Sequence, residues 1–153
     1  MAVSAKVFVN QVVGQFGGAG DWTAGSFRRV DWLNDTIKVM LLDSGWTPGQ
    51  TTQYDPTVDD LFLYQVTGTG YTSGGATLGS KTATKSSAVV TLDAADVSWT
   101  SATITARYAV VYKTGSPGSQ PLIGYVDFGS DQTATAGTFT ITWNASGMFT
   151  YTL

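Results

Sequence analysis

Short runs of strand-forming residues, separated by turn residues at close spacing, fill the sequence from about residue 36 to the C-terminus. Strand side chains point alternately to opposite faces, and several runs carry apolar residues at every second position. No helical period of ten or more residues lies between the runs. The pattern predicts an all-β fold and disfavours a parallel sheet with crossover helices. The runs cover residues 36–43, 60–68, 70–75, 76–80, 88–93, 96–100, 103–113, 121–129, 138–144 and 148–153.

The composition agrees with this fold class. All 11 acidic residues are Asp, Thr occurs 24 times and Gly 18 times. Thr favours strands, Asp and Gly favour turns, and the helix former Glu is absent. A chain of 153 residues fits one domain. We therefore predict a single-domain antiparallel β-sandwich with an irregular or partly helical N-terminal segment.

The last two runs give the strongest hairpin pattern. Phe139, Ile141 and Trp143 alternate with Thr residues, and the apolar alternation resumes after the turn residues 144–147. An apolar face opposite a Thr-rich face is typical of antiparallel strands with one side in water or against a polar partner. We predict that residues 138–144 and 148–153 pair with each other.

The first 30 residues differ from the rest. The run VFVNQVVGQF, residues 7–16, fits an edge strand or a short helix, and the alternation does not decide between them. Residues 14–29 are rich in Gly and carry the aromatic residues Phe16, Trp22 and Phe27, followed by Arg28 and Arg29. We predict a Gly-rich arm over residues 1–30 and a sandwich domain over residues 31–153.

The residue types restrict the chemistry. The sequence has no Cys and no His, which excludes disulfides, thiolate nucleophiles, Ser-His-Asp triads and His-ligated zinc within this chain. The formal net charge of −3 gives no basic field for a nucleic acid, and no apolar run reaches the length of a signal or a membrane span. We expect no enzyme activity, no nucleic-acid partner and no membrane partner.

Two further groups of residues are candidate binding sites. The glycines of residues 68–75 fall short of a phosphate-binding fingerprint, because Ser73 occupies its last position and no helix follows; a tight turn is the better interpretation. Asp pairs could bind calcium or serve turns, and none has the spacing of a calcium-binding loop. We expect no metal and no cofactor. The pairs are Asp55 with Asp59 and Asp60, Asp93 with Asp96, and Asp127 with Asp131.

The five tryptophans suggest either a core or a sugar-stacking platform. Trp99 and Trp143 lie in alternating strands, which indicates the core. Trp22, Trp32 and Trp46 lie in or beside loops and are candidates for contact with a partner. A platform of this kind would suit a carbohydrate-binding or receptor-binding module.

Arg107 lies in the middle of the predicted strand 103–113. Strict alternation places it on the face of Thr105, Ala109 and Val111. A buried guanidinium without a partner is costly, so Arg107 must reach water or an acidic side chain, with Asp127 or Asp43 as candidates. We interpret it as a structural ion pair rather than an active-site cation.

Several segments together resemble the head decoration, or cement, proteins of tailed phages. The matching segments are DTIKVMLLDSGWTP at 35–48, GTGYTSGGATL at 68–78, TITARYAVVYKTG at 103–115 and PLIGYVDFGSDQTATAGTFTITWNASG at 121–147. They cover most of the chain from about residue 31. The Gly-rich segment 14–29 is longer than expected for the family, and similar sequences include minor tail proteins.

The resemblance implies a non-enzymatic virion protein that is made in the host cytoplasm and binds the outside of an assembled capsid. It implies the major capsid protein as partner and a homo-oligomer, a dimer or a trimer. Many weak identical contacts on a lattice add up through multivalency. The candidate capsid contacts are Phe16, Trp22, Phe27, Arg28, Arg29 and Trp46. A minor tail protein, or a receptor-binding or carbohydrate-binding sandwich, is the alternative.

Overall fold

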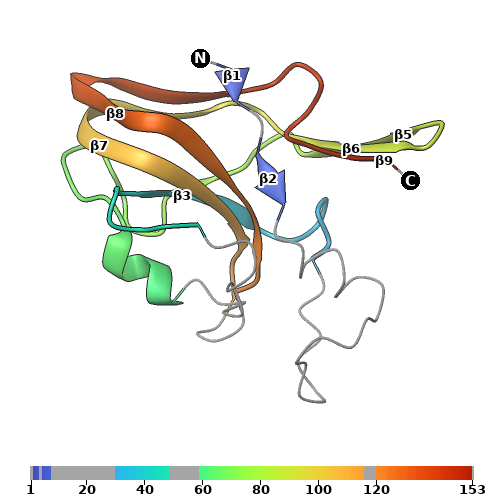
Figure 1. Ribbon diagram of the computed structural model, residues 1–153, viewed down its shortest axis with the longest axis horizontal. Coiled ribbons are helices and arrows are strands. Elements are labelled where there is room, and N and C mark those ends of the chain that lie inside the picture. Colours follow the sequence, from blue (N-terminus) through green and yellow to red (C-terminus); the bar gives the residue numbers. More distant parts are fainter. Residues whose placement is uncertain (1, 4, 8–29, 49–58, 116–119, 153) are drawn as a thin grey trace.

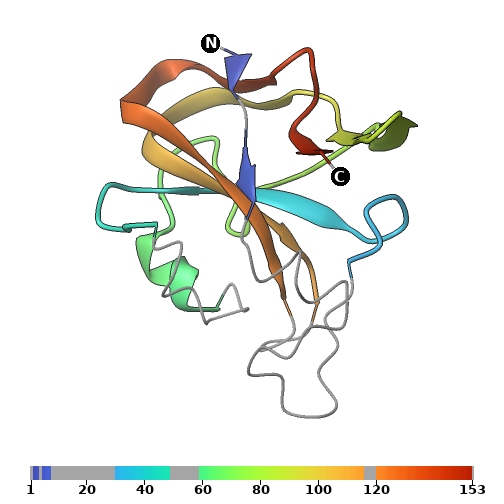
Figure 2. The same cartoon turned by 45° about the vertical axis from the view of Figure 1, so that its right-hand side comes forward.

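The computed structural model describes residues 2–3, 5–7, 30–48, 59–115 and 120–152. Two sheets pack against each other, as an all-β sandwich requires (Figures 1 and 2). The main sheet has the strand order β1-β8-β7-β3-β4, with β2 also paired to β8, and the small sheet has the order β5-β6-β9. The predicted fold class is confirmed, with one parallel pair, β1 with β8, in an otherwise antiparallel arrangement.

Two strands dominate the main sheet. Strand β7 spans Val97–Lys113 and β8 spans Leu122–Trp143, and each joins two of the predicted runs into one strand. The other elements are short. They are β1 Ala2–Val3, β2 Lys6–Val7, β3 Ile37–Leu42, the 3-10 helix η1 Asp59–Tyr64, β4 Ala76–Thr77, β5 Thr82–Ser86, β6 Val89–Asp93 and β9 Phe149–Thr152.

Strand β8 is sharply curved, as its pairing with the two N-terminal strands shows (Figure 1). Val3 pairs with Trp143, whereas Lys6 pairs with Tyr125. Along a straight strand these two positions of β8 would be roughly 60 Å apart, while residues 3 to 6 can span only about 11 Å. Register shifts against β7 accompany this curvature, and Gly129, with φ of 80°, lies in one of them.

The apolar residues form two clusters on opposite faces of the main sheet. Val39 and Leu41 of β3 belong to the larger cluster, which also contains Phe149 of the small sheet. Met40 and Leu42, on the other face of β3, belong to a second cluster with Trp46 and Leu61. The centre of the main sheet is therefore covered on both faces, which explains why β3 and the second half of β7 are buried almost continuously.

Two predicted elements differ from the structure. Residues 60–64, predicted as part of a strand, belong to η1, and of residues 61–64 only Leu61 is buried. The predicted hairpin of residues 138–144 and 148–153 is wrong: Phe139 pairs with Trp99 of β7, and β9 pairs with β6. The turn at residues 144–147 moves the chain from one sheet to the other, closed by the Gly147 N–H donating to the Asn144 carbonyl at 2.8 Å.

The N-terminus joins the main sheet earlier than the predicted boundary at residue 31. Residues 2–3 and 6–7 form β1 and β2, so the described part of the predicted arm is strand and not helix. The Ala5 N–H also donates to the Met148 carbonyl at 3.2 Å. Residues 1, 4 and 8–29 of the predicted arm lie outside the described residues.

Candidate contact surface on the outer face of the main sheet

An irregularity in the ladder between β7 and β8 changes which side chains face outward at Arg107. Ala106 pairs with Gln132 and Tyr108 pairs with Asp127, so one residue of β7 lies opposite four residues of β8. Ile104 and Ala106 belong to the larger cluster, but beyond the irregularity Tyr108 belongs to the second cluster. The alternation therefore shifts by one residue, and the predicted faces of residues 108–113 are wrong.

The same irregularity gives Arg107 its partners. Its Nη2 lies 3.1 Å from Oδ1 of Asp127, one of the two acidic candidates named from the sequence. The same Oδ1 of Asp127 also accepts the Gly129 N–H at 2.8 Å, so two donors hold this oxygen in place. The guanidinium carbon lies 5.1 Å from the centre of the Tyr108 ring. Side-chain hydrogen bonding with Tyr108, and then the charges of Asp127 and Asp131, raises the pKa of Arg107.

Three aromatic side chains, Trp46, Tyr108 and Tyr125, form a platform beneath these charges. The ring of Trp46 contacts Tyr108 edge to face at a centroid distance of 5.2 Å and Tyr125 at 5.8 Å. Trp46 is only 6% exposed. Its assignment as a capsid contact is therefore wrong for the isolated chain: the turn at residues 43–45 returns Trp46 onto the second cluster, where it is a core residue.

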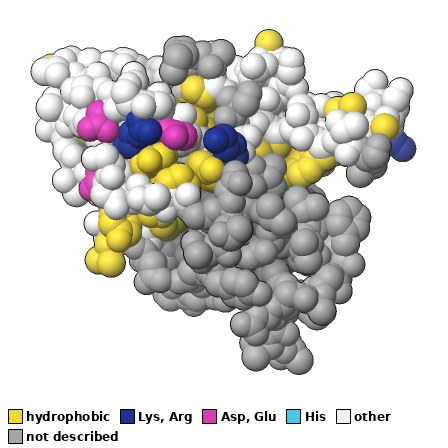
Figure 3. Space-filling model, viewed as in Figure 1, with side chains coloured by type: hydrophobic (Ala, Val, Ile, Leu, Met, Phe, Trp, Pro, Cys, Tyr) yellow, Lys and Arg dark blue, Asp and Glu magenta, His cyan; other side chains and the backbone are white. Residues whose placement is uncertain are grey.

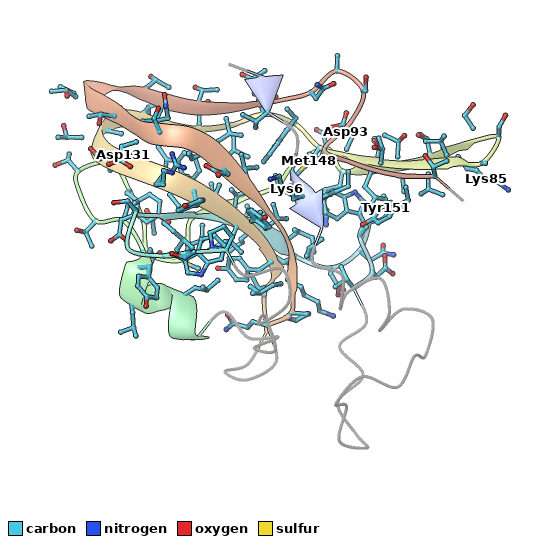
Figure 4. All side chains as sticks on the ribbon, in the orientation of Figure 1. Lys6, Lys85, Asp93, Asp131, Met148 and Tyr151 are labelled. Carbon is cyan, nitrogen blue, oxygen red and sulfur yellow. The ribbon has the colours of Figure 1, made fainter. Side chains whose placement is uncertain are left out.

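A second cation lies against this aromatic platform. The Lys6 ammonium of β2 is 5.8 Å from the centre of the Tyr125 ring. Lys6 and Arg107 thus lie on the two tyrosines that contact Trp46. Figure 3 shows basic and acidic side chains in a row above apolar side chains on this face, and Figure 4 labels Lys6 and Asp131 on it.

Next to the aromatic platform, η1 presents an exposed apolar surface, which we call the η1 patch: Phe62, Leu63 and Tyr64. Their exposed fractions are 39%, 82% and 36%. Leu61 fixes the helix by packing into the second cluster, and the Asp43 N–H donates to the Tyr64 carbonyl at 2.9 Å. Apolar atoms gather at the position of η1 in Figure 3. In the sequence these residues belong to an apolar run, residues 60–68, that resembles a strand. This resemblance gave no indication that Phe62, Leu63 and Tyr64 are exposed.

The other candidate sites have structural roles where they are described. Gly75, with φ of 76°, lies so close to the Val39 carbonyl that a side chain there would clash, as a tight turn packed on β3 requires. Asp96 accepts the backbone N–H of Trp143 at 3.0 Å. Within the described ranges no group of three or more acidic side chains is placed to hold a metal ion, and no helix is long and apolar enough to cross a membrane.

The remaining predicted contacts cannot be placed. Phe16, Trp22, Phe27, Arg28 and Arg29 lie outside the described residues. The other loop tryptophan, Trp32, is 6% exposed and donates its indole N–H to the Thr82 carbonyl at 2.9 Å. Trp99 and Trp143 are buried, which confirms their assignment to the core. All four described tryptophans are therefore core residues.

Comparison of the chain with protein-family models, curated proteins and solved structures gives no significant match. The fold and the contact surface therefore stand on the geometry described above.

Proposed function

We propose that this protein is a non-enzymatic structural protein of a tailed-phage virion that binds the outer surface of the assembled capsid and stabilises it. The η1 patch is the observation on which the proposal depends. The three large side chains of the η1 patch are exposed next to one another. Leu61 of the same helix packs into the second cluster and so attaches η1 to the main sheet. Exposed apolar clusters of this kind mark binding surfaces.

The charges beside the η1 patch support the same role. Arg107 and Asp127 are partly exposed and already oriented by their ion pair. A rim of fixed charges around apolar anchors favours one orientation on a partner, because wrongly placed charges repel or lose water without compensation. The major capsid protein would then bury Leu63 and face the charged row.

The tryptophan positions weigh against the carbohydrate-binding alternative. Sugar-stacking platforms need exposed aromatic faces, and each of the four described tryptophans is only 5% or 6% exposed. The second candidate function is that of a minor tail protein, which would use the η1 patch to bind another protein of the virion.

The test is binding to purified tailed-phage capsids that were assembled without this protein. We expect the wild-type chain to co-sediment with them and to raise their resistance to heat. The variant Leu63→Ser should weaken binding by at least about tenfold, because an anchor buried in an interface typically contributes more than 1 kcal/mol. Equal binding by the wild type and this variant would contradict the assignment of the surface.

A matched control comes from the same chain. Leu33 is 53% exposed and belongs to the turn before β3, away from η1. Leu33→Ser should bind capsids like the wild type. Substitution of Phe16, Trp22 and Phe27 by Ser, with residues 1–7 retained because they form β1 and β2, measures the contribution of the Gly-rich segment separately. Failure of the wild-type chain to bind any capsid would overturn the proposal itself.

A further inference from the structure

The β5–β6 hairpin projects from the body of the protein, and β5 forms the free edge of the small sheet (Figure 1). All five residues of β5, Thr82–Ser86, are exposed. Figure 4 shows Lys85 at the far end of this projection. An exposed edge strand offers unpaired backbone groups to another strand. Within the described ranges β6 alone pairs with β5, and the Trp32 indole N–H reaches only the carbonyl of Thr82, the first residue of β5.

The turn of the hairpin determines which backbone groups of β5 point outward. Ser86 pairs with Val89 around the two-residue turn Ser87–Ala88, and Ser87 has φ of 51°. The residues that flank a two-residue turn bond to each other, and bonded pairs then alternate along the strands. Thr84 therefore bonds inward to β6, while the N–H and C=O groups of Ala83 and Lys85 point to the open edge.

We propose that two copies of this chain pair through β5, edge to edge and antiparallel, with Thr84 on the twofold axis. In this register Ala83 of one copy exchanges two backbone hydrogen bonds with Lys85 of the other, and symmetry repeats the exchange. All four outward groups of each β5 are then satisfied. The two small sheets become one continuous sheet of six strands.

The side chains of β5 suit this self-pairing. Each Lys85 lies opposite an Ala83 rather than the other Lys85, so like charges do not face each other directly. Thr84 faces Thr84, and Thr82 faces Ser86. Hydroxyl pairs of this kind already occur across the main sheet, where Ser98 and Thr140 lie 2.9 Å apart, as do Thr105 and Thr133.

A second copy fits this edge better than an unrelated strand. The register is complementary to itself over the whole length of β5, and Lys85 disfavours partners that would place another cation opposite it. The edge is separate from the η1 patch, so this inference does not depend on capsid binding and can be tested without capsids.

The test uses the absence of cysteine from the chain. In Thr84→Cys the only thiols in a dimer are the two at the axis, where a non-hydrogen-bonded antiparallel pair has Cα atoms about 4.5 Å apart, within the range of a disulfide. We expect most of this variant to become a covalent dimer under mild oxidation on a non-reducing gel. The control Thr135→Cys, exposed on β8, keeps the β5 edge but should form no covalent dimer on the same gel. Equal cross-linking of the two variants, or none in Thr84→Cys, would overturn the proposal.

A second variant interrupts the pairing without a cross-link. Ala83→Pro removes an outward N–H and leaves the bonds of β5 to β6 in place, which is where edge strands tolerate proline. We expect the wild-type chain to dimerise in sedimentation equilibrium and Ala83→Pro to weaken the dimer by at least about tenfold. Circular dichroism checks that the sheet is retained. Unchanged dimerisation of a folded Ala83→Pro would place the interface elsewhere.

Discussion

Arg107 forms its ion pair with Asp127, although the register of the sheet places Tyr108, and not Arg107, opposite that residue. The one-residue offset arises from the irregularity between Ala106 and Tyr108. It turns Arg107 toward the ring of Tyr108 and joins the charged row to the aromatic platform. A cation that local alternation would place on an apolar face is thereby brought to a surface where an acidic partner and water are both available.

The ion pair should show measurable but modest coupling. We expect Arg107→Gln and Asp127→Asn each to lower the free energy of unfolding, and the double variant to lower it by less than the sum, because each single variant leaves one charge without its partner. Both side chains are partly exposed, so high salt should reduce the coupling. Urea unfolding of the four proteins measures it. Strictly additive single variants would show that the pair contributes no interaction energy.

Trp46 should behave as a core residue. We expect Trp46→Ala to lower the free energy of unfolding by about 3–5 kcal/mol, because it removes a buried ring that packs against Tyr108 and Tyr125. Trp46→Phe should cost less, since it keeps an aromatic side chain in the second cluster. Urea unfolding checks both values. A loss below about 0.5 kcal/mol for Trp46→Ala would instead be typical of an exposed residue.

Gly124 should not tolerate a side chain. A Cβ at this position would meet the Lys6 carbonyl and the ring of Phe149 closer than real contacts allow. We expect Gly124→Ala to lower the free energy of unfolding by about 1–3 kcal/mol through overpacking where β8, β2 and β9 converge. Gly79→Ala is the control, because no atom lies within 4 Å of the added carbon, and its effect should stay within about 0.5 kcal/mol.

Alkaline pH should destabilise the fold through Tyr112. Burial raises the pKa of Tyr112 to about 12, and its hydroxyl donates to the Gly74 carbonyl at 2.8 Å. Between pH 10 and 12 the unfolded chain loses a proton that the folded chain retains, so stability that is complete below pH 10 falls as the pH rises. In Tyr112→Phe this decline should be shallower, although the variant is less stable at pH 7 because the Gly74 carbonyl loses its donor. Denaturant unfolding at pH 7, 10 and 11 compares the two slopes.

The local alternation of residues was sufficient for several parts of the structure. It predicted the all-β class, β3, β6 and the core positions of Trp99 and Trp143. It also predicted that Arg107 must reach water or an acidic partner, with Asp127 and Asp43 as the candidates. These predictions depend only on which residues favour strands and on the cost of burying an unpaired charge, and both are properties of short segments.

Strand pairing could not be predicted in the same way. Residues 149–152 have the same period of two whether they pair with β8 or with β6. The pairing with β6 comes with the packing of Phe149 into the larger cluster, a long-range contact that the period does not encode. The run at residues 60–64 has the composition of a strand, but it forms η1, and of residues 61–64 only Leu61 enters the core. Trp46 follows a turn and has a loop-like sequence, and its burial depends on rings contributed by β7 and β8.

What the amino-acid sequence determined was the type of element at most positions and the chemistry that is missing, because side-chain volume, branching and charge act on the nearest residues. The tertiary structure alone decided where β7 and β8 bend, which sheet receives β9, and which of the aromatic residues are left outside. These outcomes depend on contacts between segments far apart in the chain. Lys6 meets Tyr125, and Trp46 meets Tyr108, only after the strands of the main sheet have paired.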